Sequence, residues 1–141
     1  MATVLVVEDD LRSAEFMKAL LDSLGHTVLE ARDGEAGLAR ATEALPDLIT
    51  VDVRMPKMDG FELTRRLKAE PRTADIPVLM ITASSEVADL EKGVEAGVDD
   101  FISKPIRRLE YAARVKSLLK VRHLKGELDR TLAYLEDLEK L

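Results

Sequence analysis

Short apolar runs and segments of helical period alternate along the chain. The mainly apolar runs cover residues 4–7, 27–30, 48–51, 78–81 and 101–102. Runs of this kind are typical of strands that are buried on both faces. Between the runs, apolar residues recur every three or four positions, which is the period of an amphipathic helix. These helical stripes cover residues 11–24, 37–45, 60–67, 87–94 and 109–119.

The ends of the stripes carry helix start and stop signals. Gly25, Pro46 and Gly97 follow three of the stripes, where a helix is expected to end. Asp59, with Glu62 three residues later, forms a capping box at the start of another. We therefore assign Asp59 to a capping role.

The pattern predicts a strand followed by a helix, repeated five times. No two-residue turn of the Asn-Gly type joins two strands, so hairpins are not expected. Alternating strands and helices indicate a doubly wound α/β fold, in which helices cover both faces of a five-stranded parallel sheet. The first, third and fourth strands are the most apolar, which favours the flavodoxin-like order 2-1-3-4-5. Ligands bind such a sheet at the carboxyl ends of strands one and three.

Composition limits the chemistry that the chain can carry. It has 141 residues, 46% of them hydrophobic, and no Cys, which excludes disulfides, iron–sulfur clusters and thiolate nucleophiles. Its two His residues, His26 and His123, stand far apart in the sequence and do not suggest a metal site. No apolar run approaches the roughly 18–20 residues of a membrane span, and no signal segment is recognisable. We expect one soluble, cytoplasmic domain with a short appendage.

The charge is unevenly distributed. The net charge is −6, and the acidic excess lies in residues 1–106, whereas residues 107–141 carry more basic than acidic side chains. An acidic body argues against nucleic acid as a direct partner. The basic run 114–125 suggests a nucleic-acid stripe, but no helix-turn-helix follows it. We favour a solvated helix face for this run.

Acidic side chains stand at the ends of two predicted strands. Glu8, Asp9 and Asp10 follow the first strand, and Asp52 ends the third. If these strands are neighbours, the carboxylates meet, repel one another and raise one another's pKa. A hard divalent cation relieves such repulsion, and Mg²⁺ suits carboxylates and retained water.

Two further side chains belong to the same predicted edge. Thr82 ends the fourth strand, and Lys104 follows the fifth. Taken singly, an acidic strand end usually caps a helix, a lysine is a solvated charge, and a threonine is common in strands. A carboxylate, a metal, an ammonium and a hydroxyl together form the set of groups that phosphoryl transfer requires. The combination favours this chemistry.

Longer motifs surround these residues. They are Val6-Val7-Glu8-Asp9-Asp10, residues 52–60, Ile81-Thr82-Ala83, residues 93–101 and Lys104-Pro105-Ile106. Together they resemble the receiver domain of bacterial two-component response regulators, over residues 3 to 119. The resemblance implies a switch that takes a phosphoryl group from the phosphohistidine of a sensor histidine kinase or a phosphotransfer protein. It implies no other enzymatic activity than self-phosphorylation and slow autodephosphorylation.

The resemblance also implies an acceptor and a metal site. Asp52 would be the phospho-acceptor. Asp9 and Asp52 would bind Mg²⁺ directly, together with the backbone carbonyl of Arg54. Glu8 would act on the ion through a bound water.

Other roles follow from the same resemblance. Lys104 would pair with the acceptor carboxylate and then with a phosphoryl oxygen, and its bond to the following Pro would be cis. The Thr82 hydroxyl would turn to the phosphoryl group while Phe101 swings inward. Arg54 and Ser84 would lie beside the path of the attacking water and tune the phosphoryl lifetime.

A second apolar pattern continues past the last stripe. Alternate spacings of three and four separate Val121, Leu124, Leu128, Thr131, Leu135 and Leu138, whereas Leu132 and Leu141 lie outside this series. Such spacing is the a/d seam of a coiled coil. A single helix over 107–141 would be ~52 Å long. We therefore divide the chain into a receiver domain, 1–119, and a helical extension, 120–141, which acts as a parallel coiled-coil linker.

The expected switch has two competitors. In the switch, phosphorylation changes the region from Thr82 to Phe101 and a homodimer surface on the fourth helix, fifth strand, fifth helix and extension. A receiver-like scaffold that is never phosphorylated would not need the whole set of site residues. The aspartyl-phosphate phosphatases are similar in that an Asp is the nucleophile, but theirs belongs to an Asp-x-Asp motif. The stretch Asp52-Val53-Arg54 lacks the second Asp, which would be the general acid. Both stay open as alternatives.

Overall fold

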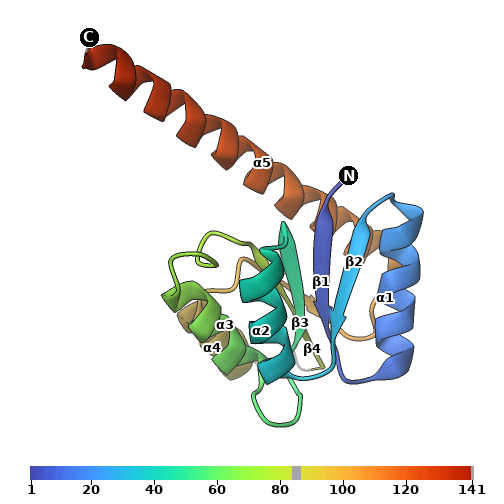
Figure 1. The fold of residues 1–141 in the computed structure, drawn as a ribbon. Coiled ribbons are helices and arrows are strands. Elements are labelled where there is room, and N and C mark those ends of the chain that lie inside the picture. The colour runs from blue at the N-terminus through green and yellow to red at the C-terminus, as the bar shows by residue number, and fades with distance from the viewer. Residues whose placement is uncertain (84–86, 141) are drawn as a thin grey trace.

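The computed structural model describes residues 1–83 and 87–140, in which strands and helices alternate along the chain (Figure 1). The strands are β1 (Thr3–Val7), β2 (Thr27–Ala31), β3 (Leu48–Asp52), β4 (Val78–Thr82) and β5 (Asp100–Ser103). The helices are α1 (Leu11–Ser23), α2 (Gly34–Ala44), α3 (Gly60–Ala69), α4 (Val87–Ala96) and α5 (Arg108–Glu139). Each predicted run and stripe corresponds to one of these elements.

The strands form one parallel sheet in the order β2-β1-β3-β4-β5, as predicted. Side chains alternate between its faces. Val4 and Val6 of β1 pack with α1 and α5, whereas Leu5 and Val7 pack with α2 and α3. The sheet is therefore the middle layer of three, with a separate apolar core on each face (Figure 1).

Aspartates begin three of the helices. The carboxylates of Asp10, Asp33 and Asp59 each accept a hydrogen bond from a backbone N–H in the first turn of α1, α2 and α3. Such caps satisfy N–H groups that have no partner within the helix. The capping role assigned to Asp59 is confirmed. Gly25 and Gly97 follow α1 and α4 with φ of 86° and 98°, a left-handed conformation that suits glycine.

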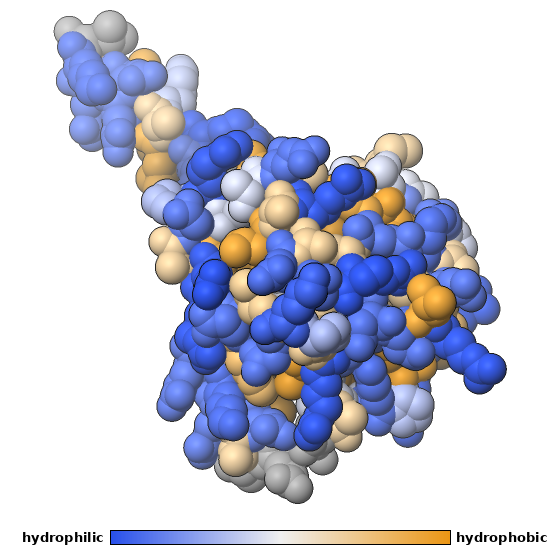
Figure 2. Space-filling model, turned by 60° about the horizontal axis from the view of Figure 1, so that its bottom comes forward, coloured by the Kyte–Doolittle hydropathy of each residue, from blue (hydrophilic) through white to orange (hydrophobic). Residues whose placement is uncertain are grey.

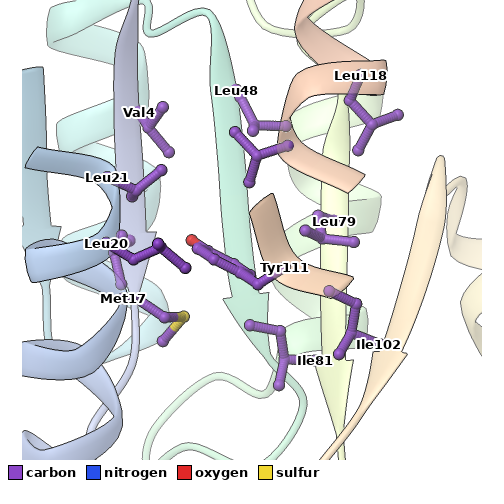
Figure 3. Close-up of a cluster of buried hydrophobic side chains, with 12 residues drawn as sticks. Val4, Met17, Leu20, Leu21, Leu48, Leu79, Ile81, Ile102, Tyr111 and Leu118 are labelled. Atoms are coloured by element: carbon purple, nitrogen blue, oxygen red, sulfur yellow. The ribbon is translucent and has the colours of Figure 1, made fainter. Parts of the chain in front are cut away.

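The core beneath α1 and α5 contains one buried aromatic ring (Figure 3). Tyr111 of α5 is fully buried among aliphatic side chains such as Met17, Leu21 and Ile102. Its hydroxyl donates a hydrogen bond to Oγ1 of Thr50 on β3, at 3.3 Å. Burial raises the pKa of Tyr111 well above its ordinary value, and the bond to Thr50 offsets a part of this rise.

We expect Tyr111→Phe to lower the free energy of unfolding at pH 8 by about 1 kcal/mol, because Thr50 loses a buried partner. At alkaline pH, ionisation of Tyr111 in the unfolded chain pulls the wild type toward unfolding. The wild type therefore loses stability as pH rises above about 10, and the Phe variant lacks this contribution. Urea unfolding at pH 8 and pH 11 measures both effects.

The second tyrosine is the control for this experiment. The side chain of Tyr134 is 63% exposed on the distal half of α5. Tyr134→Phe should therefore leave both the stability and its pH dependence unchanged. The same pH dependence in Tyr111→Phe and in the wild type would contradict the assignment.

Helix α5 continues far beyond the sheet, as the extended pattern predicted (Figure 1). Its last buried side chain is Leu118. Beyond it, apolar side chains from Val121 to Leu138 are 44–63% exposed, and they interrupt the hydrophilic surface of the projecting helix (Figure 2). Near the root of this extension, Nζ of Lys125 lies 2.8 Å from Oδ1 of Asp75. Pairing of the extension as a coiled coil stays a prediction.

None of the helices within 1–83 and 87–140 has both the length and the apolar character needed to cross a membrane.

Candidate functional site

The carboxyl ends of β1 and β3 bring three acidic side chains together. The two strands are paired, so Glu8, directly after β1, and Asp52, the last residue of β3, lie at the same edge of the sheet. Carboxylate oxygens of Glu8, Asp9 and Asp52 lie within 4.8 Å of one another. Glu8 and Asp52 are buried, and Asp9 is exposed. The structure thus gathers the carboxylates that the strand order places at one edge.

Lys104 reaches the same cluster from the end of β5. Its Nζ lies 3.4 Å from Oδ1 of Asp52 and 3.5 Å from Oε1 of Glu8. Its backbone N–H donates to the carbonyl of Thr82 at 2.7 Å, which keeps the chain beside β4. The Lys104-Pro105 bond is cis, as expected. One ammonium therefore faces two buried carboxylates.

The cluster is short of positive charge. Burial is the main reason that the pKa of Glu8 rises to about 8, and the neighbouring Asp52 adds to the rise. The backbone N–H of Asp10, 3.2 Å from Oε2 of Glu8, opposes it, as does the charge of Lys104. Partial burial would lower the pKa of Lys104, but Asp52 and Glu8 outweigh this and raise it. The cluster therefore favours a proton or a further cation.

A divalent cation fits this set of donors. Within the described residues, the buried Oε1 of Glu8 has no hydrogen-bond partner. The ammonium of Lys104 lies 3.5 Å from this oxygen and offsets part of its charge. A buried carboxylate oxygen that accepts no hydrogen bond is nevertheless costly. Every ligand that the cluster offers is a hard oxygen, which suits Mg²⁺ better than a softer metal. The exposed Asp9 carboxylate makes the cluster accessible from solvent.

A hollow of about 500 Å³ opens beside the cluster. Asp9, Arg54 and Thr82 line it, with Asp89 and Lys92 of α4. Thr82 is 4% exposed at the end of β4, whereas Arg54 is exposed. The hollow can admit a phosphoryl donor that is much larger than a water molecule.

Two predicted residues remain, Phe101 and Ser84. Phe101 lies on β5 and is partly buried against a small cluster that contains Val53, Phe61 and Met80. Ser84 lies outside the described residues.

The sequence did not reveal how closely the loop after β3 returns to the site. The N–H of Gly60 donates to the carbonyl of Val53 at 2.8 Å. A Cβ on Gly60 would lie 2.6 Å from the carbonyl oxygen of Asp52, so only glycine fits. Gly60 therefore supports the backbone of Asp52. The one available signal was a glycine directly after the cap Asp59.

Comparison with known proteins identifies the family. Residues 4–116 match the response regulator receiver domain. The chain belongs to this family. The matched range contains the whole acidic cluster and Lys104. The family places this receiver domain among signalling proteins.

Several relatives support the same conclusion. The domain is 41% identical over 120 residues to DNA-binding dual master transcriptional regulator RpaA of Synechocystis, covering 85% of this chain and 50% of that protein. It is 38% identical to the signal receiver domain of a signal transduction histidine kinase from Syntrophus aciditrophicus, with a TM-score of 0.80 over 85% of this chain and 91% of that chain.

A third relative contains a metal ion. The receiver domain of sensor histidine kinase PA1611 from Pseudomonas aeruginosa is 29% identical, with a TM-score of 0.79 over 84% of this chain and 98% of that one. A magnesium ion is coordinated in its active site cleft. In the present chain, the carboxylates of Glu8, Asp9 and Asp52 lie close enough together to hold a metal ion. The chain spans about half the length of RpaA.

Proposed function

We propose that this receiver domain is a phosphorylation switch, in which Asp52 accepts a phosphoryl group from the phosphohistidine of a sensor histidine kinase or a phosphotransfer protein. The observation that carries the proposal is the buried Asp52 carboxylate, 3.4 Å from the ammonium of Lys104. The carboxylate can act as the nucleophile, and the neighbouring ammonium is already placed to offset the negative charge of the acyl phosphate that forms.

The transfer is a displacement at phosphorus. A carboxylate oxygen of Asp52 attacks, the new P–O bond forms as the P–N bond to the histidine breaks, and the electron pair leaves with the imidazole nitrogen. Lys104 pairs first with the carboxylate and then with a phosphoryl oxygen. The hydroxyl of Thr82 donates a hydrogen bond to another phosphoryl oxygen. Phe101 turns inward in step, and the surface between Thr82 and Phe101 changes.

Mg²⁺ supplies positive charge that offsets the charge on the equatorial phosphoryl oxygens. We assign its direct ligands to Asp9, Asp52 and the backbone carbonyl of Arg54, with Glu8 acting through a water. The clustering of the three carboxylates supports this assignment, as does the Oε1 of Glu8, which accepts no hydrogen bond within the described residues. Few protein ligands and several waters are usual for this ion.

Slow hydrolysis of the acyl phosphate ends the signal, and no other enzymatic activity is proposed. We propose that Arg54 and Ser84 tune the phosphoryl lifetime, with the side chain of Arg54 beside the path of the attacking water. The position of Arg54 on the lining of the hollow supports its part in this proposal.

The test of the proposal is incubation with acetyl phosphate and Mg²⁺, followed by intact mass. A single phosphate adduct that persists for minutes supports the switch. Steady release of inorganic phosphate without an adduct would indicate an aspartyl-phosphate phosphatase. An unchanged mass would indicate a scaffold that is never phosphorylated.

We also propose a division of the chain and a homodimer. Residues 1–119 form the receiver domain, and 120–141 form the coiled-coil linker. Two copies pair through α4, β5 and α5 and along the seam of the extension. The exposed apolar side chains beyond Leu118 support the seam, because monomers rarely leave such a stripe uncovered. We further propose that the domain is cytoplasmic and does not itself bind nucleic acid. The net charge of −6 supports the second of these statements.

Truncation after Leu119 should shift the protein toward monomer and leave phosphorylation intact. Each apolar side chain contributes ~1.5–3 kcal/mol when fully buried. The seam positions are only partly covered in a dimer, and association has its own entropic cost, so pairing should depend on concentration. Light scattering of both forms at matched concentrations measures the shift.

A matched pair of full-length variants separates the seam from the helix. Leu128→Ser lies in the seam and should weaken the dimer, whereas Asp129→Ser lies beside it and should not. If light scattering gives the same number of chains per particle before and after truncation, the coiled coil is excluded. Loss of phosphorylation would show that the extension belongs to the core.

A further inference from the structure

The part of α5 beyond Leu118 has one apolar face, which we call the extension stripe. Successive residues of an α-helix are turned by about 100° around its axis. Placed in this way, five apolar residues fall within an arc of about 80°: Val121, Leu124, Leu128, Leu132 and Leu135. All five side chains are 48–61% exposed. The stripe therefore contains Leu132 and leaves out Thr131, whereas the a/d seam predicted from the sequence does the reverse.

The spacing of the stripe matches the natural turn of an α-helix. The pattern repeats after eleven residues, from Val121 to Leu132 and from Leu124 to Leu135. An eleven-residue repeat has about 3.67 residues per turn, which is close to the roughly 3.6 of a relaxed helix. A seven-residue repeat has about 3.5 and therefore imposes a left-handed supercoil. Two copies of α5, which runs straight in Figure 1, can thus keep the stripe in contact without this supercoil.

The body of the domain lies on another side of the helix. Near the root of the extension, the side chains that the body partly covers are Arg122 and Gly126. Around the helix axis they lie about 120° and 160° from Leu128, the middle of the stripe. The described part of the body therefore leaves the stripe accessible to a second helix.

The stripe continues the side of the domain that carries β5. Arg114 lies only about 40° from Leu128 around the axis of α5. Its Nη1 is 3.1 Å from Oδ2 of Asp100, the first residue of β5. This strand is at the edge of the sheet. A second copy that pairs in parallel through α4, β5 and α5 would therefore also meet the stripe.

The charges beside the stripe are compatible with a parallel copy. Lys125 borders the stripe on one side, and Glu127 borders it on the other. In a parallel pair of helices, the first side of one copy faces the second side of the other. The two positions differ by about 3 Å along the axis. Lys125 of each copy would therefore lie beside Glu127 of the other.

We propose that a second copy of this chain docks in parallel on the extension stripe, and that the two helices run almost straight instead of forming a seven-residue coiled coil. The proposal rests on the homodimer proposed above and changes which residues form its seam. Every position of the stripe is apolar, whereas the a/d seam places the hydroxyl of Thr131 between the helices. Leu132 is thus a contact residue, and Thr131 lies at the margin of the interface.

Single cysteines in the full chain distinguish the two seams. The chain has no Cys, so each variant carries one thiol. A disulfide requires Cα atoms roughly 4.4–6.8 Å apart, which residues that face each other across the seam can reach. Under mild oxidation, Leu132→Cys should form several-fold more cross-linked dimer than its neighbour Thr131→Cys. Leu128→Cys belongs to both seams and is the positive control.

Two further variants measure the same difference without a cross-link. Leu132→Ser should raise the Kd of the dimer roughly tenfold or more, because each copy loses an apolar contact. Thr131→Leu should leave the Kd nearly unchanged, whereas in the a/d seam it would add an apolar contact and tighten the dimer. Sedimentation equilibrium of the full chain measures both values.

The possible outcomes separate the stripe from the homodimer. Cross-linking of Thr131→Cys that equals or exceeds that of Leu132→Cys would overturn the stripe and retain the homodimer. If Leu132→Cys cross-links only with added Leu124→Cys, the copies are antiparallel, and the proposal is overturned. The same holds if light scattering shows a dimer and no variant cross-links, since the copies then pair through the body alone. A wild type that is monomeric by light scattering would refute the homodimer itself.

Discussion

The variant Asp52→Asn should take up no phosphoryl group from acetyl phosphate and Mg²⁺. The amide keeps the shape of the side chain, but it is not a nucleophile at neutral pH. Lys104 also loses the carboxylate that lies 3.4 Å from its Nζ. Intact mass after a fixed incubation should show the adduct in the wild type and none in the variant. The pKa of Glu8 should fall as well, because the Asp52 charge that helps to raise it is gone.

Asp59→Asn is the matched control. Asp59 lines the same hollow, but its carboxylate caps α3 by accepting the N–H of Glu62 at 2.9 Å. Asparagine caps a helix about as well as aspartate. This variant should therefore be phosphorylated like the wild type. An adduct of undiminished yield in Asp52→Asn would refute the acceptor, and loss of the adduct in Asp59→Asn would give Asp59 a chemical role.

Asp9→Ala should abolish phosphorylation at low Mg²⁺ while the fold stays intact. Removing a group that only supports a metal ligand typically costs ~10–100-fold in metal affinity, and loss of a direct ligand should cost at least as much. The fold should be as stable as the wild type or more so, because the cluster with Glu8 and Asp52 loses one negative charge. A titration of the adduct against Mg²⁺ and a thermal melt without the ion measure the two effects.

Asp10→Asn is the neighbouring control. Oδ2 of Asp10 accepts the N–H of Ser13 at 3.2 Å and caps α1, and Asp10 is not one of the three clustered acids. Its substitution should leave the Mg²⁺ requirement where it was. Normal phosphorylation of Asp9→Ala at low Mg²⁺ would show that the metal site is wrongly placed.

The elements and their order could be predicted because their signals are local. The run at 78–81 is apolar since β4 is buried on both faces, and Gly97 ends α4 with a left-handed φ of 98°. The parallel arrangement follows from the alternation of strands and helices. The edge position of β2 follows from its more polar sequence, and its first residue, Thr27, is exposed.

Contacts between distant segments could not be predicted in this way. The bond from Tyr111 to Thr50 joins residues 61 positions apart. Nζ of Lys68 binds two backbone carbonyls near the start of β4 and lies 3.1 Å from Oδ2 of Asp99. Each such pair depends on how helices pack on the sheet, and a one-dimensional pattern does not contain that information.

The residues of the site could be predicted from the sequence, but how deeply each of them is buried could not. Strand order places the acids and Lys104 at one edge, but it does not show that Glu8 is fully buried while the adjacent Asp9 is exposed. Neither does it show that Gly60 is required by atoms of another element. A glycine can be recognised as required only when the atoms that surround its Cα are known.

The unbroken course of α5 makes it a lever. Its first turns are fixed in the core by Tyr111, Val115 and Leu118, and the same helix runs on to Glu139. The projecting part is roughly 30 Å long, so a tilt of about 10° at its root would move its tip by roughly 5 Å. A small rearrangement at the sheet would thus become a larger displacement at the far end of α5.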